Sequence, residues 1–318
     1  PGPMKESKLT PRIAETAKAL WYVYLAITIA CALAYWLAGM TVFDAICHSF
    51  STVSTGGFST HDASMAYWNS TPIDIIATVF MLIGGISFAL HFAVWRGKSL
   101  LAYMRDPECR FFLGLMLLYM LMVGGGLLVF GVHEAPGEAT RHAAFQVASF
   151  GTGTGLTSTN AAAWPGFIPL LLVFTSFIGG CAGSTAAGMK VVRAALVFRH
   201  SIRELRRLIY PNGVFALRFG KHVVNDRVLQ AVWGFVGVYI TLSVIFTLLF
   251  TTTGMDLTTA VSAVAASINN LGVGIGQVGG GFANITDEAK WMMTLLMLLG
   301  RLEIFTFLVL FTPLFWRQ

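Results

Sequence analysis

Three segments of equal length repeat one another along the chain, and each begins and ends on a glycine. Every segment spans eighteen positions between its two glycines, carries an alanine six residues after the first, and has an apolar residue directly after the last. The segments are residues 39–57, 137–155 and 254–272. A helix of fixed length that delivers a glycine to the same place three times is typical of a repeated re-entrant membrane loop. The repeat therefore indicates transport across a membrane more than it indicates an enzyme.

The composition supports a membrane location. Hydrophobic residues make up 56% of the chain and charged residues only 11%, whereas an ordinary soluble domain carries roughly 25% charged residues. Six apolar stretches are long enough to cross a bilayer core, which takes about 20 residues of helix. They are residues 20–37, 73–95, 111–132, 164–198 with an interruption, 228–250 and 291–315.

Each glycine-flanked segment lies between two apolar stretches and is too short to span the membrane itself. We therefore predict an all-α polytopic membrane protein made of three repeated units. Each unit consists of a transmembrane helix, a re-entrant helix with its loop, and a second transmembrane helix. The predicted units are residues 1–110, 111–222 and 223–318.

The basic residues predict an orientation in which the N-terminus is cytoplasmic. That orientation places 18 of the 21 Lys and Arg residues on the cytoplasmic side, as the positive-inside bias requires. Arg141 and Lys290 lie on the opposite side. A basic cytoplasmic face serves topology and contact with anionic lipid, so the net charge of +6 needs no nucleic-acid partner. The cytoplasmic set is Lys5, Lys8, Arg12, Lys18, Arg96, Lys98, Arg105, Arg110, Lys190, Arg193, Arg199, Arg203, Arg206, Arg207, Arg218, Lys221, Arg227 and Arg317.

The ends of the three segments are candidate ion-binding loops. Each re-entrant helix starts near a carboxylate or hydroxyl that can cap it (Thr41 with Asp44, Glu138, Asp256), so the negative end of its dipole points toward the loop and favours a cation. The loops carry no charged side chain, which leaves backbone carbonyls and neutral side-chain oxygens as ligands, as in potassium filters. Glycine at positive φ lets successive carbonyls point inward. The candidate residues are Ser54, Thr55, Gly56, Gly57, Thr152, Gly153, Thr154, Gly155, Asn269, Asn270, Leu271 and Gly272.

With three further motifs the sequence resembles the bacterial Trk-type potassium uptake proteins, the TrkH/TrkG/KtrB superfamily. The motifs are GGCAGST at 179–185, NNLG at 269–272 and GRLEIFT at 300–306, and the likeness covers essentially all 318 residues. It implies a potassium transporter, and no enzyme, in the bacterial inner membrane, with four pore-loop units arranged pseudo-fourfold around one pore. This chain resembles units two, three and four, so we expect a first unit to precede it.

The resemblance also carries expectations about residues and partners. It places Gly57, Gly155 and Gly272 on the filter glycines of the family, with potassium as the transported substrate and no other cofactor. It implies a homodimer and a cytosolic nucleotide-binding regulator of the TrkA type. Two departures from the family pattern are the glycine-rich sequence GTGTGL at 151–156 and Val273, which stands where a proline is common.

The fourth apolar stretch is interrupted by residues 179–188, where the propensity for continuous helix is poor. Non-helical backbone at membrane depth persists only where protein or a water-filled cavity surrounds it. The resemblance implies an intramembrane loop that gates the pore, and the alternative is close helix packing through Gly179 and Gly183. Ala186 and Ala187 replace glycines of the family, which predicts a stiffer loop. The candidate gate residues are Gly179, Gly180, Gly183, Ser184, Thr185, Gly188 and Arg301.

Arg301 is predicted about eleven residues into the last apolar stretch, where an arginine is costly unless it is paired or hydrated. Glu303 is too close in sequence to share its helix face. Arg301 therefore either faces the pore, as a positive barrier to cations or a support for the gate loop, or forms a buried ion pair with another span.

Two other functions compete with potassium conduction. A proton- or sodium-coupled potassium symporter would share the fold, although Glu303 is the one acidic side chain predicted at membrane depth. A membrane-embedded hydrolase would need a base near a loop serine or threonine, and His48 lies in the first re-entrant helix only. The GxGxxG pattern at residues 274–279 lacks the βαβ context of a nucleotide site, and the cysteines lack metal-ligand spacing. The basic amphipathic residues 193–208 fit either a regulator or anionic lipid.

Overall fold

The computed structural model describes residues 13–316 apart from 134, 221 and 314. Lys5, Lys8, Arg12, Lys221 and Arg317, which contribute to the predicted orientation, lie outside the described residues. The helices are α1 (Ile13–Leu37), α2 (Val42–Val53), η1 (Ser64–Tyr67), α3 (Thr71–Gly84), α4 (Phe88–Gly97), α5 (Leu101–Arg105), α6 (Pro107–Val129), α7 (Pro136–Thr152), η2 (Ala161–Ala163), α8 (Ile168–Phe177), α9 (Val191–Ile209), α10 (Asp226–Thr252), α11 (Leu257–Ile268), η3 (Gly276–Val278), α12 (Asp287–Arg301) and α13 (Phe305–Val309).

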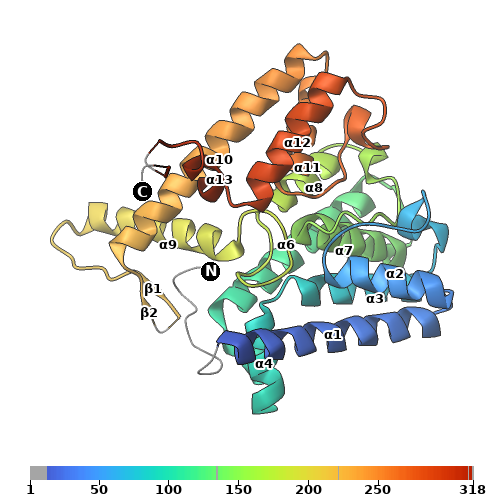
Figure 1. The fold of residues 1–318 in the computed structure, drawn as a ribbon, viewed down its shortest axis with the longest axis horizontal. Helices are drawn as coiled ribbons and strands as arrows, with labels where there is room; N and C mark the ends of the chain where they lie inside the picture. The colour runs from blue at the N-terminus through green and yellow to red at the C-terminus, as the bar shows by residue number, and fades with distance from the viewer. Residues whose placement is uncertain (1–12, 134, 221, 314, 317–318) are drawn as a thin grey trace.

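The predicted all-α class is confirmed. Within the described part of the chain the strands are limited to β1 (Arg218–Phe219) and β2 (His222–Val223), which form a small antiparallel hairpin. The same order of elements occurs three times: a long helix (α1, α6, α10), a shorter re-entrant helix (α2, α7, α11) and a third helix (α3, α8, α12). The three copies are arranged around the middle of the molecule, where the segments after the re-entrant helices meet (Figure 1).

Three of the six predicted spans are continuous helices of sufficient length and apolarity, at residues 15–37 in α1, in α6 and in α10. The prediction of one continuous span at 73–95 is wrong, because α3 and α4 meet at an angle of 95°. The backbone turns at Gly84 and Gly85, whose carbonyls accept hydrogen bonds from Thr185 N and Cys181 N of the interrupted fourth stretch. The bend thus gives that stretch its backbone partners.

The fourth and sixth predicted spans are also shorter than predicted. Of the stretch 164–198, only α8 is a short apolar helix before the interruption, and the remainder belongs to α9. In the last stretch α12 ends at Arg301, and Glu303, in the turn before the short helix α13, has φ +53°. A Cβ at Gly300 would lie 1.9 Å from the carbonyl oxygen of Ile268. The end of α12 therefore approaches the re-entrant helix α11 as closely as backbones allow.

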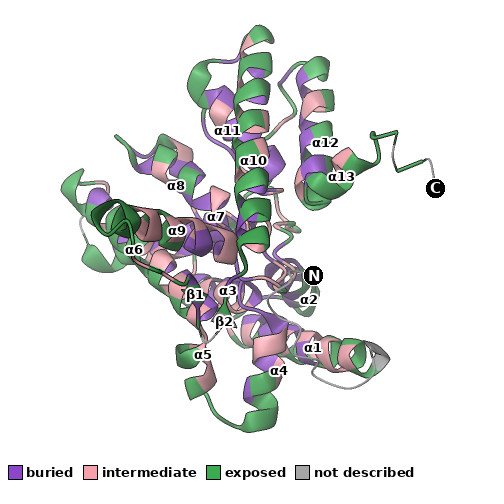
Figure 2. Cartoon of the chain, turned by 90° about the vertical axis from the view of Figure 1, so that its left-hand side faces the viewer, coloured by how far each residue is buried: buried purple, intermediate pink, exposed green. Residues whose placement is uncertain are grey.

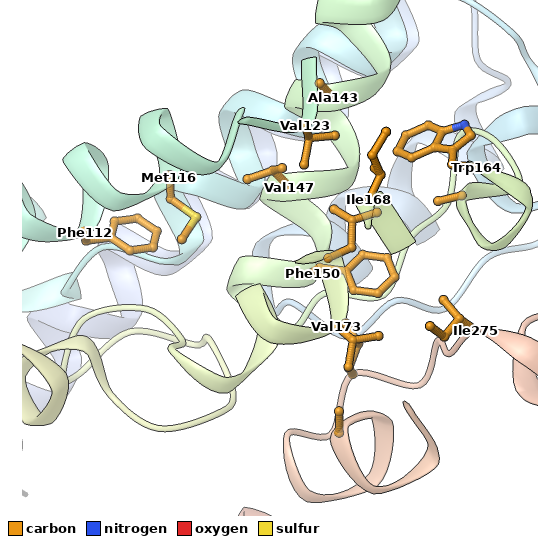
Figure 3. Close-up of a cluster of buried hydrophobic side chains, with 14 of the residues drawn as sticks. Phe112, Met116, Val123, Ala143, Val147, Phe150, Trp164, Ile168, Val173 and Ile275 are labelled. Carbon is orange, nitrogen blue, oxygen red and sulfur yellow. The ribbon is translucent and has the colours of Figure 1, made fainter. Parts of the chain in front are cut away.

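Each copy has its own apolar core. The middle core contains side chains from α6, α7 and α8, and Ile275 of the third copy reaches it (Figure 3). Its members include Val123, Val147, Phe150 and Ile168, all of which are buried. Large apolar side chains also remain exposed along the outer faces of the long helices (Figure 2). Such a band of exposed apolar side chains is what lipid contact requires.

Candidate functional site

Two of the three re-entrant helices start with a side-chain cap. Thr41 Oγ1 accepts the N–H of Asp44 at the start of α2, and Asp256 accepts the N–H groups of Thr258 and Thr259 at the start of α11. Hydrogen bonds from the Thr60 and Thr41 hydroxyls hold the pKa of Asp44 below its ordinary value, and those from Thr259 do the same for the pKa of Asp256. The helix α7 begins at a proline without a side-chain cap.

The loops after these helices share one backbone conformation. We call them loop 1 (residues 54–57), loop 2 (152–155) and loop 3 (269–272). The second and fourth residues of every loop have positive φ, and the third does not. The values are +54° and +73° at Thr55 and Gly57, +69° and +81° at Gly153 and Gly155, and +50° and +77° at Asn270 and Gly272. The predicted positive φ at all three terminal glycines is therefore present.

One backbone hydrogen bond fixes the start of this turn in every loop. The third loop residue donates its N–H to the carbonyl five positions earlier, at the end of the re-entrant helix. The bonds are Gly56 N to Ser51 O at 2.7 Å, Thr154 N to Ser149 O at 2.8 Å and Leu271 N to Ala266 O at 2.9 Å. Such bonds satisfy terminal helix carbonyls that would otherwise lack a partner.

The loops touch through their terminal glycines. A Cβ at Gly57 would lie 2.1 Å from the carbonyl oxygen of Thr154, and a Cβ at Gly155 would lie 2.0 Å from that of Leu271. Both distances are too short for a nonbonded contact, so only glycine fits at positions 57 and 155. A Cβ at Gly272 would meet no described atom within 4 Å. The structure thus brings the three candidate loops together edge to edge, with Gly57 and Gly155 each against the carbonyl of the residue that precedes the terminal glycine of the next loop.

The polar side chains of the loops are mostly engaged with the scaffold. The Asn269 amide donates to Ser176 Oγ and accepts from the Tyr239 hydroxyl, and the Asn270 amide donates to Met297 O. In loop 2 the two threonine hydroxyls bond each other at 2.6 Å. Backbone carbonyls are therefore the main oxygen ligands that these loops can offer an ion.

Residues 178–190 form a closed loop and not a helix, so the alternative of helix packing through Gly179 and Gly183 is wrong. The two ends pair: Gly179 N donates to Met189 O at 2.8 Å, and Val191 N donates to Gly180 O at 3.1 Å. A Cβ at Gly179 would lie 1.8 Å from Ala187 O. The close approach of glycine therefore serves the loop's own closure.

This closed loop lies against the ends of two re-entrant helices. Thr185 Oγ1 donates to Val53 O at 2.9 Å and to Gly84 O at 3.1 Å. Ala187 N donates to Thr152 O at 3.2 Å. The candidate gate residue Thr185 thus binds the carbonyl that immediately precedes loop 1, and Ala187 of the same closed loop binds a carbonyl of loop 2.

A cavity of about 320 Å³ lies where the closed loop, loops 1 and 3 and the end of α12 meet. Its lining includes Ser54, Asn270, Thr185, Lys190 and Arg301. Arg301 is the last residue of α12 and is exposed there, so its predicted place inside a continuous span is wrong. Among the described residues Arg301 forms no ion pair. Within the described residues the alternative that Arg301 forms a buried ion pair with another span is therefore wrong.

Sequence reasoning missed the charged pair beside Arg301. Glu303 bonds Arg193 at 2.7 Å, and the Arg193 guanidinium lies 3.9 Å from the centre of the Phe235 ring. Arg193 belongs to α9, directly after the closed loop. The basic pattern that starts at Arg193 predicted the helix, but the partner 110 residues away carries no local signal.

Repeated units whose re-entrant loops meet edge to edge define a class of membrane transport protein. The chain belongs to the TrkH family, described as a cation transport protein, which matches residues 1–317. It is 52% identical over its whole length to the Trk system potassium uptake protein TrkH of Vibrio parahaemolyticus and 47% identical to that of Escherichia coli K12. The chain spans 66% of the length of both relatives.

A solved structure agrees with the fold. The crystal structure of the potassium transporter TrkH from Vibrio parahaemolyticus superposes with a TM-score of 0.92 at 51% sequence identity. The match covers 98% of this chain and 67% of the other.

Proposed function

We propose that the chain forms part of a potassium uptake pore in which ions pass beside loops 1, 2 and 3. The observation that carries this proposal is the shared loop geometry, with paired positive-φ positions and a glycine of one loop against a carbonyl of the next. Carbonyl oxygens in such an arrangement can replace the hydration shell of a monovalent cation. The names of the relatives, which specify potassium uptake, support the same ion.

A fourth loop would complete the pore. The contacts run in one direction, from Gly57 to Thr154 and from Gly155 to Leu271, while Gly272 has open space beside it. A further loop with the same conformation would place its third carbonyl against Gly272 and its glycine against the carbonyl of Gly56. The arrangement would then be pseudo-fourfold, with predicted units 1–110, 111–222 and 223–318 as three of its four parts.

The closed loop at 178–190 would gate this pore. It bonds the ends of two re-entrant helices and borders the cavity that Arg301 also lines. An uncompensated guanidinium there would repel cations that leave the filter. If the closed loop moved away from Val53 and Thr152, and Arg301 moved with it, the ion path below the three loops would open.

The two rival functions find less support. In a proton-coupled symporter Glu303 would have to release and bind a proton, yet its carboxylate is held by Arg193. One observation fits a hydrolase, which needs a histidine within hydrogen-bond distance of a serine: His48 Nε2 lies 2.9 Å from Ser59 Oγ. His48 is fully buried and its other nitrogen bonds the Asp44 carbonyl. The pair therefore holds the segment after loop 1 and lacks access to a substrate. Sodium coupling is separated from conduction by the flux experiment below.

We further propose a bacterial inner-membrane location with the N-terminus of this chain in the cytoplasm. The described basic residues of α9 and the β1–β2 hairpin would then face the cytoplasm, where anionic lipid is available to them. A homodimer and a nucleotide-binding regulator of the TrkA type are the partners that the family relationship suggests.

Ion flux through the reconstituted full-length protein tests the function. Potassium and rubidium should enter liposomes along an imposed potential, and sodium should enter far more slowly. Potassium entry that stops without a sodium or proton gradient would support the coupled alternative. Equal entry of sodium and potassium would refute selective potassium conduction.

A further inference from the structure

Near the N-terminal end of α7, one arginine of the second copy donates hydrogen bonds to three acceptors of the first copy. Arg141 Nε donates to Asp74 Oδ2 at 2.7 Å, Nη2 donates to Asn69 Oδ1 at 2.9 Å, and Nη1 donates to Thr71 Oγ1 at 3.1 Å. The planar guanidinium suits such multiple contacts, whereas a lysine ammonium does not. This set of three guanidinium hydrogen bonds, which we call the fork, therefore fixes both the position and the direction of α7 against α3.

The carboxylate of the pair is buried, its arginine is half-buried, and the pair occurs at one junction. Asp74 is 1% exposed, and a buried carboxylate is tolerated only with a charged partner. The position of Arg141 in the repeat corresponds to Phe43 in α2 and Thr258 in α11. Neither side chain can form such a pair, so this contact is not a general feature of the repeat.

The segment that receives the fork is strained at two positions. Asn69 has φ +41° and Ser64 has φ +53°, values that are uncommon for residues other than glycine. Both side chains contact the second copy: Asn69 accepts from Arg141, and Ser64 Oγ accepts the N–H of Thr157 at 3.2 Å. Ala66 N donates to Thr157 O at 3.2 Å. Strain of this kind persists where surrounding contacts over-determine the backbone, often at functional positions.

We propose that Arg141 is a positioning residue for ion selectivity that holds loop 2 in register with loop 1. The inference rests on the proposed function of these loops. The helix α7 is a single rigid element from Pro136 to Thr152, so a clamp near its outer end fixes the loop at its inner end. Selective coordination depends on the placement of the carbonyl oxygens, and small displacements of a first shell degrade function.

The test compares potassium and sodium entry for variants of the full-length transporter in liposomes. Arg141→Gln should lower the potassium-to-sodium ratio by about tenfold, which corresponds to about 1.4 kcal/mol of discrimination, while potassium entry itself continues. Arg141→Lys should fall between wild type and Arg141→Gln, because it keeps the charge at Asp74 but loses the fork. Thr258→Val at the corresponding position of α11 is the matched control and should keep the wild-type ratio.

A milder variant covers the case in which Arg141→Gln fails to fold. Asn69→Gly removes one acceptor of the fork, and glycine accommodates φ +41° without strain, so this variant should fold and still lower the ratio severalfold. Wild-type ratios in Asn69→Gly and Arg141→Lys would overturn the positioning role. A wild-type protein that does not prefer potassium would instead overturn the proposed function, which separates the two failures.

Discussion

The two junctions between neighbouring loops reach the same geometry with different polar chemistry, although both also have apolar packing, in which Phe145 and Leu156 of the second copy join the core of the first. At the first junction, between loops 1 and 2, polar groups outside the loops connect the copies, including the Arg141–Asp74 pair and the bonds of Thr157. At the second, between loops 2 and 3, Leu271 and Ile275 join the apolar core of the middle copy. The polar link beside these loops, from Asn269 to Ser176, is uncharged, and an ion pair between the second and third copies, Arg193–Glu303, lies at the end of α12.

The difference shows which part of the repeat is under geometric constraint. The glycine–carbonyl contact is the same at both junctions to within 0.1 Å (2.1 and 2.0 Å), whereas the polar side chains around the two junctions differ. Backbone conformation of the loops is therefore the common requirement. The side chains around each junction stabilise it by whatever contacts the local sequence provides.

The largest expected effect comes from filling the shared contact. Gly57→Ala and Gly155→Ala should each abolish potassium selectivity, because the new methyl group would overlap a carbonyl oxygen of the next loop. Gly131→Ala is the matched control: Gly131 also has positive φ, at +65°, but open space around it, so only a backbone cost of about 1–2 kcal/mol applies. Flux ratios and expression should be measured together, and preserved selectivity in Gly155→Ala would break the equivalence of the junctions.

The second junction should depend on its buried amide. Asn269→Leu would leave the buried hydroxyls of Ser176 and Tyr239 without this partner, which should lower the free energy of unfolding by about 2 kcal/mol. Asn270→Ala removes a single bond to Met297 O at a less buried site and serves as the comparison. Thermal unfolding in detergent would measure both, and an equal midpoint for the two variants would contradict the assigned role of Asn269.

The closed loop should respond at the hydroxyl that binds the first copy. Thr185→Val removes the hydrogen bonds to Val53 O and Gly84 O, so stability should fall by about 1 kcal/mol and basal potassium flux should rise. Ser184→Ala is the control, since the Ser184 hydroxyl bonds Cys181 O within its own loop. Flux without a regulator would measure the effect, and reduced flux with normal expression in Thr185→Val would indicate a purely structural role.

The smallest effect concerns acid sensitivity and distinguishes α11 from α7. The pKa of Asp256 is lowered in the folded protein, so as the pH falls the unfolded chain takes up the proton first. The contribution of Asp256 is therefore complete above about pH 5 and is lost at pH values below its ordinary pKa of 3.8. Asp256→Asn keeps a good capping group that does not titrate, and it should make the unfolding midpoint less dependent on pH below 4. An unchanged pH profile in Asp256→Asn would contradict this account.

Local signals in the sequence predicted much of the architecture. Glycine spacing located the three loops, capping residues located the starts of α2 and α11, and a glycine-rich interruption located the closed loop at 178–190. The bend between α3 and α4 was missed because Gly84 and Gly85 lie inside an apolar run, and hydropathy does not register direction. The end of α12 at Arg301 was also missed, because it too lies inside an apolar run and hydropathy does not register where a helix turns.

Contacts between distant residues had no signal in the sequence. Arg141 and Asp74 are 67 positions apart, and nothing in either segment specifies the other. The scaffold roles of Asn269 and Asn270 were likewise hidden, because a neutral amide in a loop is equally suited to bind an ion or to support the backbone. Only the three-dimensional arrangement shows that these amides bond α8, α10 and α12.

Rubidium binding is the most direct test of the claim that the loop carbonyls form the ion site. Crystals of the full-length protein grown with rubidium should show anomalous density between the loops, within coordination distance of backbone carbonyls in residues 54–57, 152–155 and 269–272. Density confined to the cavity beside Arg301, or to side chains away from the loops, would contradict the account.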